Sequence, residues 1–168
     1  MQKELITTTS AQTQEAGRLL AKEFQGGEVI CLSGELGAGK TTFTQGLLGG
    51  LGLEGPFTSP TFLVMKEYEI KYPISNIQYP IKYQNVYHID AYRVGTEDIL
   101  ALGWEEMVAN PENIIIIEWA ERVKEIIPNN AIWINFEWLD ENRRKITLSN
   151  DQCSMINSQS IINTLMFN

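Results

Sequence analysis

The sequence is poor in cysteine and has no long apolar run. Its two cysteines, Cys31 and Cys153, stand far apart without the spacing of a metal site or a redox pair. We therefore expect two buried, reduced thiols and a cytoplasmic protein. No uninterrupted apolar stretch approaches the roughly 20 residues that span a bilayer. The segment MQKELITTTS lacks the apolar core of a secretory signal, so we expect neither secretion nor a membrane partner.

Positive charge is also scarce. The chain carries 13 lysines and arginines against 21 aspartates and glutamates, which gives a net charge of −8. Its one basic cluster, residues 143–145, closely follows Asp140 and Glu141. A protein that binds nucleic acid unaided normally presents a basic face to the phosphates. If nucleic acid matters to this protein, we expect a partner to hold it.

The length of 168 residues suits one domain, expected to span residues 1–168. Apolar periodicity and turn residues predict its elements. Helices are expected over residues 10–25, 41–51 and 96–109, buried strands over residues 28–33 and 114–118, two strands within residues 62–90 around a loop near residues 73–80, and an antiparallel hairpin over residues 131–139 and 144–149. Thr9 and Gln12 have the spacing of a capping box, and a last helix is expected from Ser158. This order favours an α/β fold, in which helices cover a sheet.

The strongest motif is a glycine-rich loop. Residues 34–41, GELGAGKT, follow the apolar run 29–32 and match the phosphate-binding pattern G-x-x-x-x-G-K-T at every fixed position. Glycines let the loop backbone turn its N–H groups toward phosphate oxygens. Lys40 supplies a positive charge, the Thr41 hydroxyl is placed to ligate Mg²⁺, and the next helix adds the positive end of its dipole. The loop predicts a nucleoside triphosphate site rather than a chance turn.

Two carboxylates end apolar strands. Asp90 ends NVYHID and Glu118 ends IIIIE, so we expect both at the carboxyl edge of a parallel sheet, beside the nucleotide. There an acidic group can complete the Mg²⁺ site, although each could also be a solvated strand end. His88, the only histidine, points the same way as Asp90 on an ideal strand and is expected to make a structural hydrogen bond. Trp119 follows Glu118 and suits either core packing or a lid over the nucleotide.

The loop SPTF, residues 59–62, comes shortly after the phosphate loop and its helix. Its hydroxyls are placed like those of a switch that senses the γ-phosphate, and a turn into a strand is the alternative.

The chain lacks the Asn-Lys-x-Asp guanine signature of GTPases and the Leu-Ser-Gly-Gly signature of ABC-type ATPases. A small-molecule kinase stays open as an alternative. It is disfavoured, because such enzymes gather arginines in a lid over the phosphates and the arginines of this chain are too scattered to form an obvious one. They are Arg18, Arg93, Arg122, Arg143 and Arg144.

In order along the chain, GELGAGKTTFTQGLL, SPTF, YHIDAYR, LGWEE and IIIIEWAERV resemble the TsaE (YjeE) family over about residues 5–148. Members are small bacterial P-loop ATPases required for the threonylcarbamoyladenosine modification of tRNA. The resemblance implies a P-loop NTPase fold, with a mostly parallel central sheet flanked by helices and an antiparallel strand portion. It also implies ATP and Mg²⁺ as cofactors. Residues 150–168 match poorly, and residues 70–84 look longer than the usual connection.

The same resemblance implies residue roles. Lys40, Asp90 and Glu118 would be catalytic, with Asp90 acting on the attacking water or through the water shell of the metal. Thr41 and Glu118 would bind the metal. The residues implied in nucleotide binding are Thr9, Glu35, Leu36, Gly37, Ala38, Gly39, Lys40, Thr41, Thr42, Ser59, Thr61, Trp119 and Arg144.

The resemblance also implies partners. The family is similar to an accessory motor that docks on the TsaB–TsaD complex, which transfers a threonylcarbamoyl group to adenosine 37 of tRNA. We expect a Mg²⁺-dependent ATPase that is slow alone and stimulated by these partners, with tRNA contacted indirectly through the complex. The alternatives are a small-molecule P-loop kinase and a nucleotide-gated binding module with negligible turnover.

Overall fold

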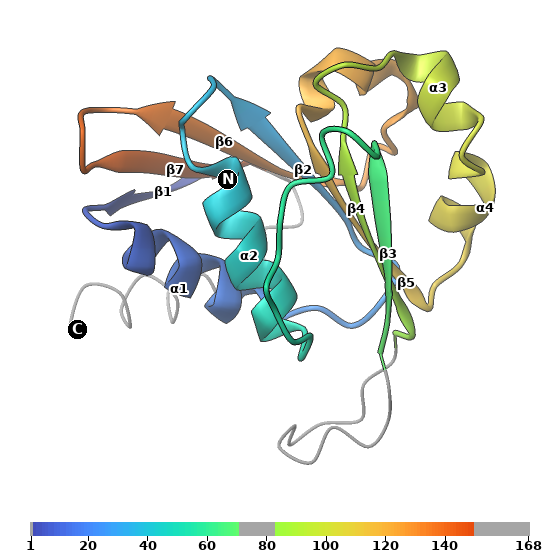
Figure 1. The fold of residues 1–168 in the computed structure, drawn as a ribbon, viewed down its shortest axis with the longest axis horizontal. Coiled ribbons are helices and arrows are strands. Elements are labelled where there is room, and N and C mark those ends of the chain that lie inside the picture. The colour runs from blue at the N-terminus through green and yellow to red at the C-terminus, as the bar shows by residue number, and fades with distance from the viewer. Residues whose placement is uncertain (1, 71–82, 150–168) are drawn as a thin grey trace.

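The computed structural model describes residues 2–70 and 83–149. The expected loop near residues 73–80, Cys153 and the expected helix from Ser158 lie outside the described residues. Seven strands form one sheet in the order β1-β7-β6-β2-β5-β4-β3 (Figure 1). They are β1 (Gln2–Thr7), β2 (Val29–Gly34), β3 (Met65–Glu69), β4 (Asn85–Asp90), β5 (Asn113–Glu118), β6 (Ile132–Trp138) and β7 (Arg144–Ser149). The helices are α1 (Ser10–Ala21), α2 (Lys40–Gly50), α3 (Thr96–Leu100), α4 (Trp104–Ala109) and the 3₁₀ helix η1 (Ala120–Ile126).

The sheet is mixed, with a parallel centre. β6, β2, β5 and β4 run parallel to one another, while β7, β1 and β3 pair antiparallel to their neighbours, so three of the six pairings are parallel. The expected α/β layering is confirmed, and so is the hairpin of β6 and β7. The expectation of a mostly parallel sheet is corrected to a parallel core with antiparallel flanks.

The edge strand β1 was not expected from the sequence. Its apolar Ile6 is 54% exposed, whereas the polar Thr7 is buried. The hydroxyls of Thr7 and Thr13 satisfy each other at 2.8 Å. This reverses the alternation of apolar and polar residues by which a half-buried strand is recognised.

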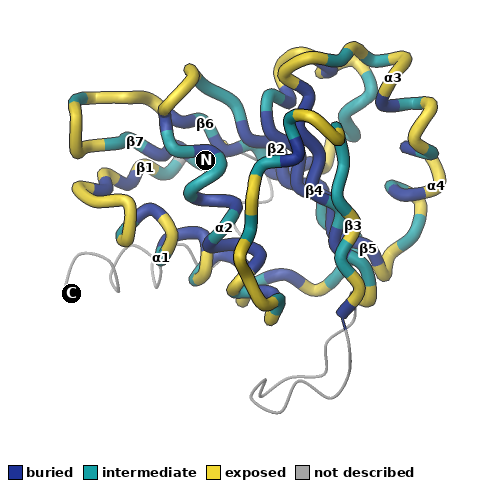
Figure 2. Tube along the Cα trace, viewed as in Figure 1, coloured by how far each residue is buried: buried dark blue, intermediate teal, exposed yellow. Residues whose placement is uncertain are grey.

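Both faces of the sheet centre are covered. α1 and α2 pack on one face, where Leu20, Phe43 and Leu47 join the core that contains Ile30 and Ile116. α3, α4 and η1 lie over the other face, whose core includes Cys31, so every residue of β5 is buried (Figure 2). A strand buried on both faces reads as a continuous apolar run, which explains IIIIE. Cys31 is a free, buried thiol as expected, and its burial raises its pKa.

Two helix predictions need correction. The expected helix over residues 96–109 is broken into α3 and α4 at Gly103, whose φ of 85° lies in the left-handed region. α1 ends at Ala21 rather than near residue 25. Thr9 caps α1 by accepting the N–H of Gln12 at 3.1 Å, but the Gln12 side chain accepts from the N–H of Thr8 rather than of Thr9. The capping box is therefore displaced by one residue.

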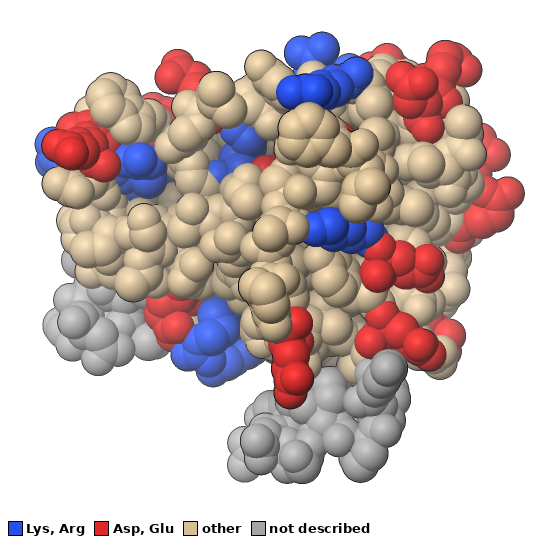
Figure 3. All heavy atoms as spheres, in the orientation of Figure 1, with Lys and Arg blue, Asp and Glu red and all other residues tan. Residues whose placement is uncertain are grey.

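Charged side chains are distributed unevenly over the surface. Figure 3 shows acidic groups gathered along the side that carries α3 and α4, with lysines and arginines dispersed elsewhere. The exposed acids of these helices are Glu97, Asp98, Glu105 and Glu106. Among the described residues, no helix is long and apolar enough to cross a membrane.

The backbones of α1 and α2 touch through glycines. A Cβ placed on Gly46 would lie 1.9 Å from the carbonyl oxygen of Gln14, and one on Gly17 would lie 2.3 Å from that of Phe43. Only hydrogen atoms fit into these gaps. This contact brings the start of α1, with Thr13 near Gly39, close to the start of α2.

We expect Gly46→Ala to lower the free energy of unfolding by about 2 kcal/mol or more, because the added methyl group meets backbone that cannot move aside. Gly49→Ala on the same helix is the matched control, since a Cβ there meets nothing within 4 Å. Its expected effect is neutral to stabilising by about 0.5–1 kcal/mol, from helix propensity. Urea denaturation of both variants checks the close approach, and equal stabilities would contradict it.

Candidate functional site

The glycine-rich loop connects β2 to α2 as expected. Gly34, Gly37 and Gly39 have φ values of 126°, 78° and 105°, which side chains rarely allow. At Gly34 the constraint is also steric, since a Cβ would lie 2.1 Å from the carbonyl oxygen of Phe136 on β6. The loop is therefore held against the sheet at one end and leads into the N-terminus of α2 at the other. α2 begins at Lys40, one residue before the expected start.

Lys40 lies buried inside this loop. Its Nζ donates to the carbonyl oxygens of Gly34 at 2.6 Å and Glu35 at 2.8 Å, and it stands 3.6 Å from the centroid of the Trp119 ring. Burial lowers the pKa of Lys40, and the charges of Glu118, Glu121 and Asp90 oppose that shift. A desolvated cation attracts an anion more strongly than a hydrated one does.

Thr41 and Glu118 are in direct contact. The Thr41 hydroxyl donates to Glu118 Oε2 at 2.8 Å, and Glu118 Oε1 is 2.9 Å from His88 Nε2. The β4–β5 and β2–β5 registers set Glu118 beside Asp90 and Leu32, which brings this carboxylate under the start of α2. A hydroxyl oxygen and a carboxylate oxygen are suitable ligands for Mg²⁺.

The described residues offer Mg²⁺ only part of a ligand set. No three of their His, Cys, Asp and Glu side chains are grouped so as to hold a metal ion by themselves. Mg²⁺ commonly binds through one or two protein groups and takes its other ligands from substrate phosphates and water. Thr41 and Glu118 therefore fit a Mg²⁺ that arrives with a nucleotide.

Asp90 holds the loop at residues 59–64. Its Oδ2 accepts from the hydroxyls of Ser59 at 2.8 Å and Thr61 at 2.6 Å, and its Oδ1 accepts from the N–H of Tyr92 at 2.9 Å. The backbone N–H of Asp90 donates to the carbonyl of Val64 at 2.8 Å. Val64 has a φ of 66°, which costs energy for a β-branched residue. The expected switch and the expected strand-end carboxylate thus form one hydrogen-bonded unit.

A cavity of about 290 Å³ joins these groups. It is lined by Leu36, Gly37, Gly39, Lys40, Thr41, Thr42, Ser59, Thr61, Asp90, Tyr92, Glu118 and Trp119. Trp119, at a φ of 62°, contacts Tyr92 with ring centroids 4.9 Å apart. Trp119 therefore lines the cavity wall and also packs on the core. Core packing is confirmed, and the role as a lid over the nucleotide stays a prediction.

A smaller hollow of about 90 Å³ opens on the other side of the loop. It is lined by Thr9, Ser10, Thr13, Gly37, Gly39, Thr42, Glu141, Asn142 and Arg144. Arg144 Nε donates to the carbonyl of Gly37 at 3.2 Å. The structure therefore brings Thr9 and Arg144 to the loop from the two ends of the described chain. Glu35 and Ala38 line neither cavity: Ala38 is buried, and Glu35 contributes its carbonyl to Lys40.

Sequence reasoning missed several residues near the loop. Tyr92 lines the larger cavity, and Glu121 Oε1 accepts from the N–H of Gly34 at 3.5 Å. Both lie within the motifs YHIDAYR and IIIIEWAERV: Tyr92 is two positions after Asp90, and Glu121 is three positions after Glu118. Asn142 and Glu141 had no such signal, because a turn between β6 and β7 brings them to the site.

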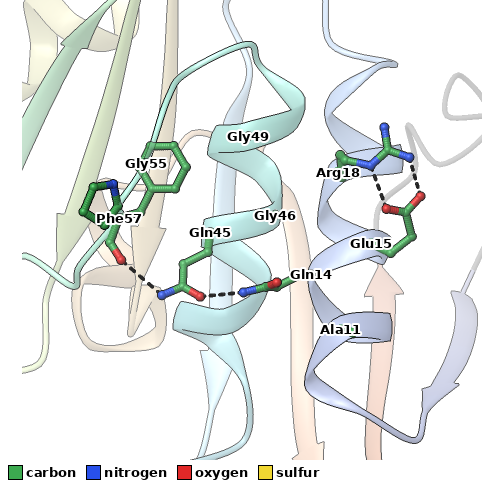
Figure 4. Close-up of a pocket in the computed structure, with 10 residues that line it drawn as sticks. Ala11, Gln14, Glu15, Arg18, Gln45, Gly46, Gly49, Gly55 and Phe57 are labelled. Atoms are coloured by element: carbon green, nitrogen blue, oxygen red, sulfur yellow. Dashed lines mark hydrogen bonds and ion pairs between the residues drawn. The ribbon is translucent and has the colours of Figure 1, made fainter.

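A larger groove lies away from this chemistry. It measures about 500 Å³ and runs between α1, α2 and residues 55–57. Figure 4 shows Gln14 and Gln45 bridging it: Gln14 donates to Gln45 at 2.9 Å, and Gln45 donates to the carbonyl of Phe57 at 3.1 Å. Arg18 in its wall is paired with Glu15. The groove lacks the loop glycines, the lysine and the strand-end carboxylates, so the 290 Å³ cavity is the candidate site.

Known proteins are similar to this chain in sequence. The family model described as "Threonylcarbamoyl adenosine biosynthesis protein TsaE" matches residues 7–146. The protein of Rickettsia felis named tRNA threonylcarbamoyladenosine biosynthesis protein TsaE is 34% identical over 158 residues, which cover 93% of this chain and 81% of that protein. The protein of the same name from Aquifex aeolicus is 36% identical over 148 residues, covering 87% and 95%.

The fold is also similar to a solved structure. The crystal structure of YdiB from Bacillus subtilis superimposes with a TM-score of 0.70 at 26% identity, covering 99% of this chain and 95% of that one. The family match includes the glycine-rich loop, the segment at residues 59–64 and both strand-end carboxylates. The chain therefore belongs to the TsaE family of tRNA threonylcarbamoyladenosine biosynthesis proteins.

Proposed function

We propose that the protein is a Mg²⁺-dependent ATPase that serves the TsaB–TsaD complex in the threonylcarbamoyladenosine modification of adenosine 37 of tRNA. Family membership supports a role in threonylcarbamoyladenosine biosynthesis. The observation that carries the ATPase proposal is the contact of Thr41 with Glu118 at 2.8 Å, beside the buried Lys40 in a phosphate loop. An anion-binding loop and a partial Mg²⁺ ligand set meet in one cavity.

The residues of the cavity divide the work between them. Lys40 exchanges its bonds to the Gly34 and Glu35 carbonyls for the β- and γ-phosphate oxygens, and the loop N–H groups hold the same phosphates. Thr41 and Glu118 would hold the metal, while Thr9 and Arg144 border the hollow that would take the nucleoside. A Mg²⁺ held by Thr41 and Glu118 would neutralise charge on the phosphate oxygens.

Asp90 and the loop at residues 59–64 supply the switch. Both side-chain hydroxyls of this loop that border the cavity, those of Ser59 and Thr61, are held by one carboxylate oxygen. A γ-phosphate nearby offers these hydroxyls another acceptor, and their release leaves Asp90 free to orient the attacking water. Nucleotide state is thereby linked to the conformation of an exposed segment, in which Phe62 is 85% and Leu63 is 69% exposed.

Surface charge supports a protein partner rather than direct tRNA binding. A net charge of −8 repels the phosphates of tRNA, so the TsaB–TsaD complex holds the tRNA and this protein acts through the complex. A tRNA-modifying role supports the proposal that the protein acts in the cytoplasm.

Arginine positions disfavour the kinase alternative. A kinase lid gathers arginines over the transferred phosphoryl group. Arg18 is paired with Glu15 in the distant groove, Arg93 stacks on Phe62, and Arg143 is paired with Asp140. Arg144 borders the smaller hollow and no arginine lines the larger cavity among the described residues.

The proposal is tested by following the γ-phosphate of labelled ATP. The protein is assayed alone, with a small-metabolite extract, and with purified TsaB, TsaD and tRNA. We expect inorganic phosphate to be released slowly by the protein alone and faster with its partners, because hydrolysis requires the switch to be organised. Label on a metabolite would establish a kinase, and tight ATP binding without phosphate release in any mixture would establish a binding module.

Two variants test the roles in the cavity. We expect Lys40→Ala to weaken ATP binding by at least about tenfold, since a charge-assisted hydrogen bond contributes about 1.5–3 kcal/mol. Glu118→Ala should lower Mg²⁺-dependent phosphate release by at least about tenfold. Lys22→Ala and Glu105→Ala, at exposed positions outside the cavity, are the matched controls for titration calorimetry and phosphate assays. Unchanged hydrolysis in the Glu118 variant would remove that residue from the site.

The switch assignment predicts a change in backbone protection. In Asp90→Ala the hydroxyls of Ser59 and Thr61 lose their shared acceptor, so the N–H groups of Leu63 and Val64, both bonded to the Pro60 carbonyl, should exchange at least about tenfold faster. Hydrogen exchange read by mass spectrometry measures this. Glu67→Ala on β3, which loses only an exposed bond to Tyr87, is the control. Equal exchange in wild type and Asp90→Ala would show that Asp90 does not hold the loop.

A further inference from the structure

His88 lies beneath Glu118 in the core of the molecule. Its partner across β4 and β5 is Ile116, whose side chain belongs to the core under α1 and α2. The His88 side chain is 1% exposed and that of Glu118 is 2% exposed, and their nearest polar atoms are 2.9 Å apart. His88 therefore does not line the candidate cavity itself; it contacts Glu118, whose carboxylate does.

The two oxygens of Glu118 are divided between two donors. Oε2 accepts from the Thr41 hydroxyl and Oε1 accepts from His88. An ionised carboxylate only accepts hydrogen bonds, so the proton of this contact lies on His88 Nε2. The other ring nitrogen, Nδ1, is buried without a partner among the described residues. A neutral ring protonated on Nε2 meets both conditions, because it leaves a lone pair rather than an N–H group unpaired.

We propose that His88 is a positioning residue for the metal site. Its hydrogen bond to Oε1 prevents the carboxylate from turning, so that Oε2 stays directed at Thr41 and at the Mg²⁺ that arrives with ATP. The inference rests on the proposed function, since it assigns His88 a part in the same site. Ligands of metal ions are commonly oriented by such outer hydrogen bonds, and their loss typically lowers metal affinity about 10–100-fold.

A merely structural histidine would act differently. Such a histidine would only fill space and donate a hydrogen bond to Oε1, so its replacement would destabilise the fold. Nucleotide binding would then weaken to the same extent with and without Mg²⁺. A positioning residue acts only on the metal-dependent part. The distinguishing quantity is therefore the ratio of ATP affinities with and without Mg²⁺.

The test compares His88→Leu with His88→Gln in the full chain. The Leu side chain has no donor, whereas the Gln amide nitrogen can reach the position of imidazole Nε2. Binding of N-methylanthraniloyl-ATP is followed by fluorescence anisotropy in EDTA and during titration with Mg²⁺. For His88→Leu we expect the half-saturating Mg²⁺ concentration to rise about 10–100-fold, with affinity in EDTA unchanged within about twofold. For His88→Gln we expect the Mg²⁺ response of the wild type within about threefold.

Each outcome bears on one claim. If the wild-type protein binds the nucleotide equally with and without Mg²⁺, the proposed Mg²⁺-dependent function fails and the inference fails with it. If the wild type responds to Mg²⁺ and His88→Leu responds identically, only the role of His88 is overturned. A melting curve reports whether His88→Leu folds. If His88→Leu does not fold, His88→Asn takes its place, because Asn carries the same amide as Gln on a side chain too short to reach the position of imidazole Nε2. Equal Mg²⁺ responses of the Asn and Gln variants would then overturn the inference.

Discussion

The register between β2, β5 and β4 is the constraint on which the candidate site depends. Leu32, Glu118 and Asp90 stand side by side across these parallel strands, directly where β2 gives way to the glycine-rich loop. A shift of one residue in β5 would turn Glu118 to the opposite face of the sheet, away from Thr41. Burial of β5 on both faces resists such a shift, because each of its isoleucines is packed on one side or the other. The core thus fixes the position of the Glu118 carboxylate.

The polar groups of the site satisfy one another. Lys40 is bonded to carbonyls of its own loop, Thr41 to Glu118, and Asp90 to Ser59 and Thr61. Buried polar groups left unpaired are costly, so these internal bonds hold the side chains near the positions where phosphates and Mg²⁺ would meet them. The proposed nucleotide binding would exchange one set of hydrogen bonds for another. The exchange at Asp90 would carry the nucleotide state to an exposed apolar loop, which is a surface suited to a protein partner.

Local patterns in the sequence were sufficient for the loop and its flanks. The spacing from Gly34 to Thr41 and the apolar runs ending in Asp90 and Glu118 depend on neighbouring residues alone. The structure brings Lys40, Thr41 and both strand-end carboxylates to one cavity. Other features depend on distant contacts. The bonds from Ser59 and Thr61 to Asp90 span 31 and 29 positions. The edge strand with its exposed Ile6 follows from tertiary packing, which local periodicity does not encode. The break between α3 and α4 has a local cause, the left-handed backbone of Gly103.

The most direct test of the account is a crystal structure of the protein with Mn²⁺ and a non-hydrolysable ATP analogue, with the metal located by its anomalous signal. The account predicts one metal between the nucleotide phosphates, Thr41 Oγ1 and the Glu118 carboxylate, and Lys40 released from the loop carbonyls to the phosphates. Metal bound elsewhere, with the Thr41–Glu118 bond and the Lys40 contacts unchanged, would contradict it.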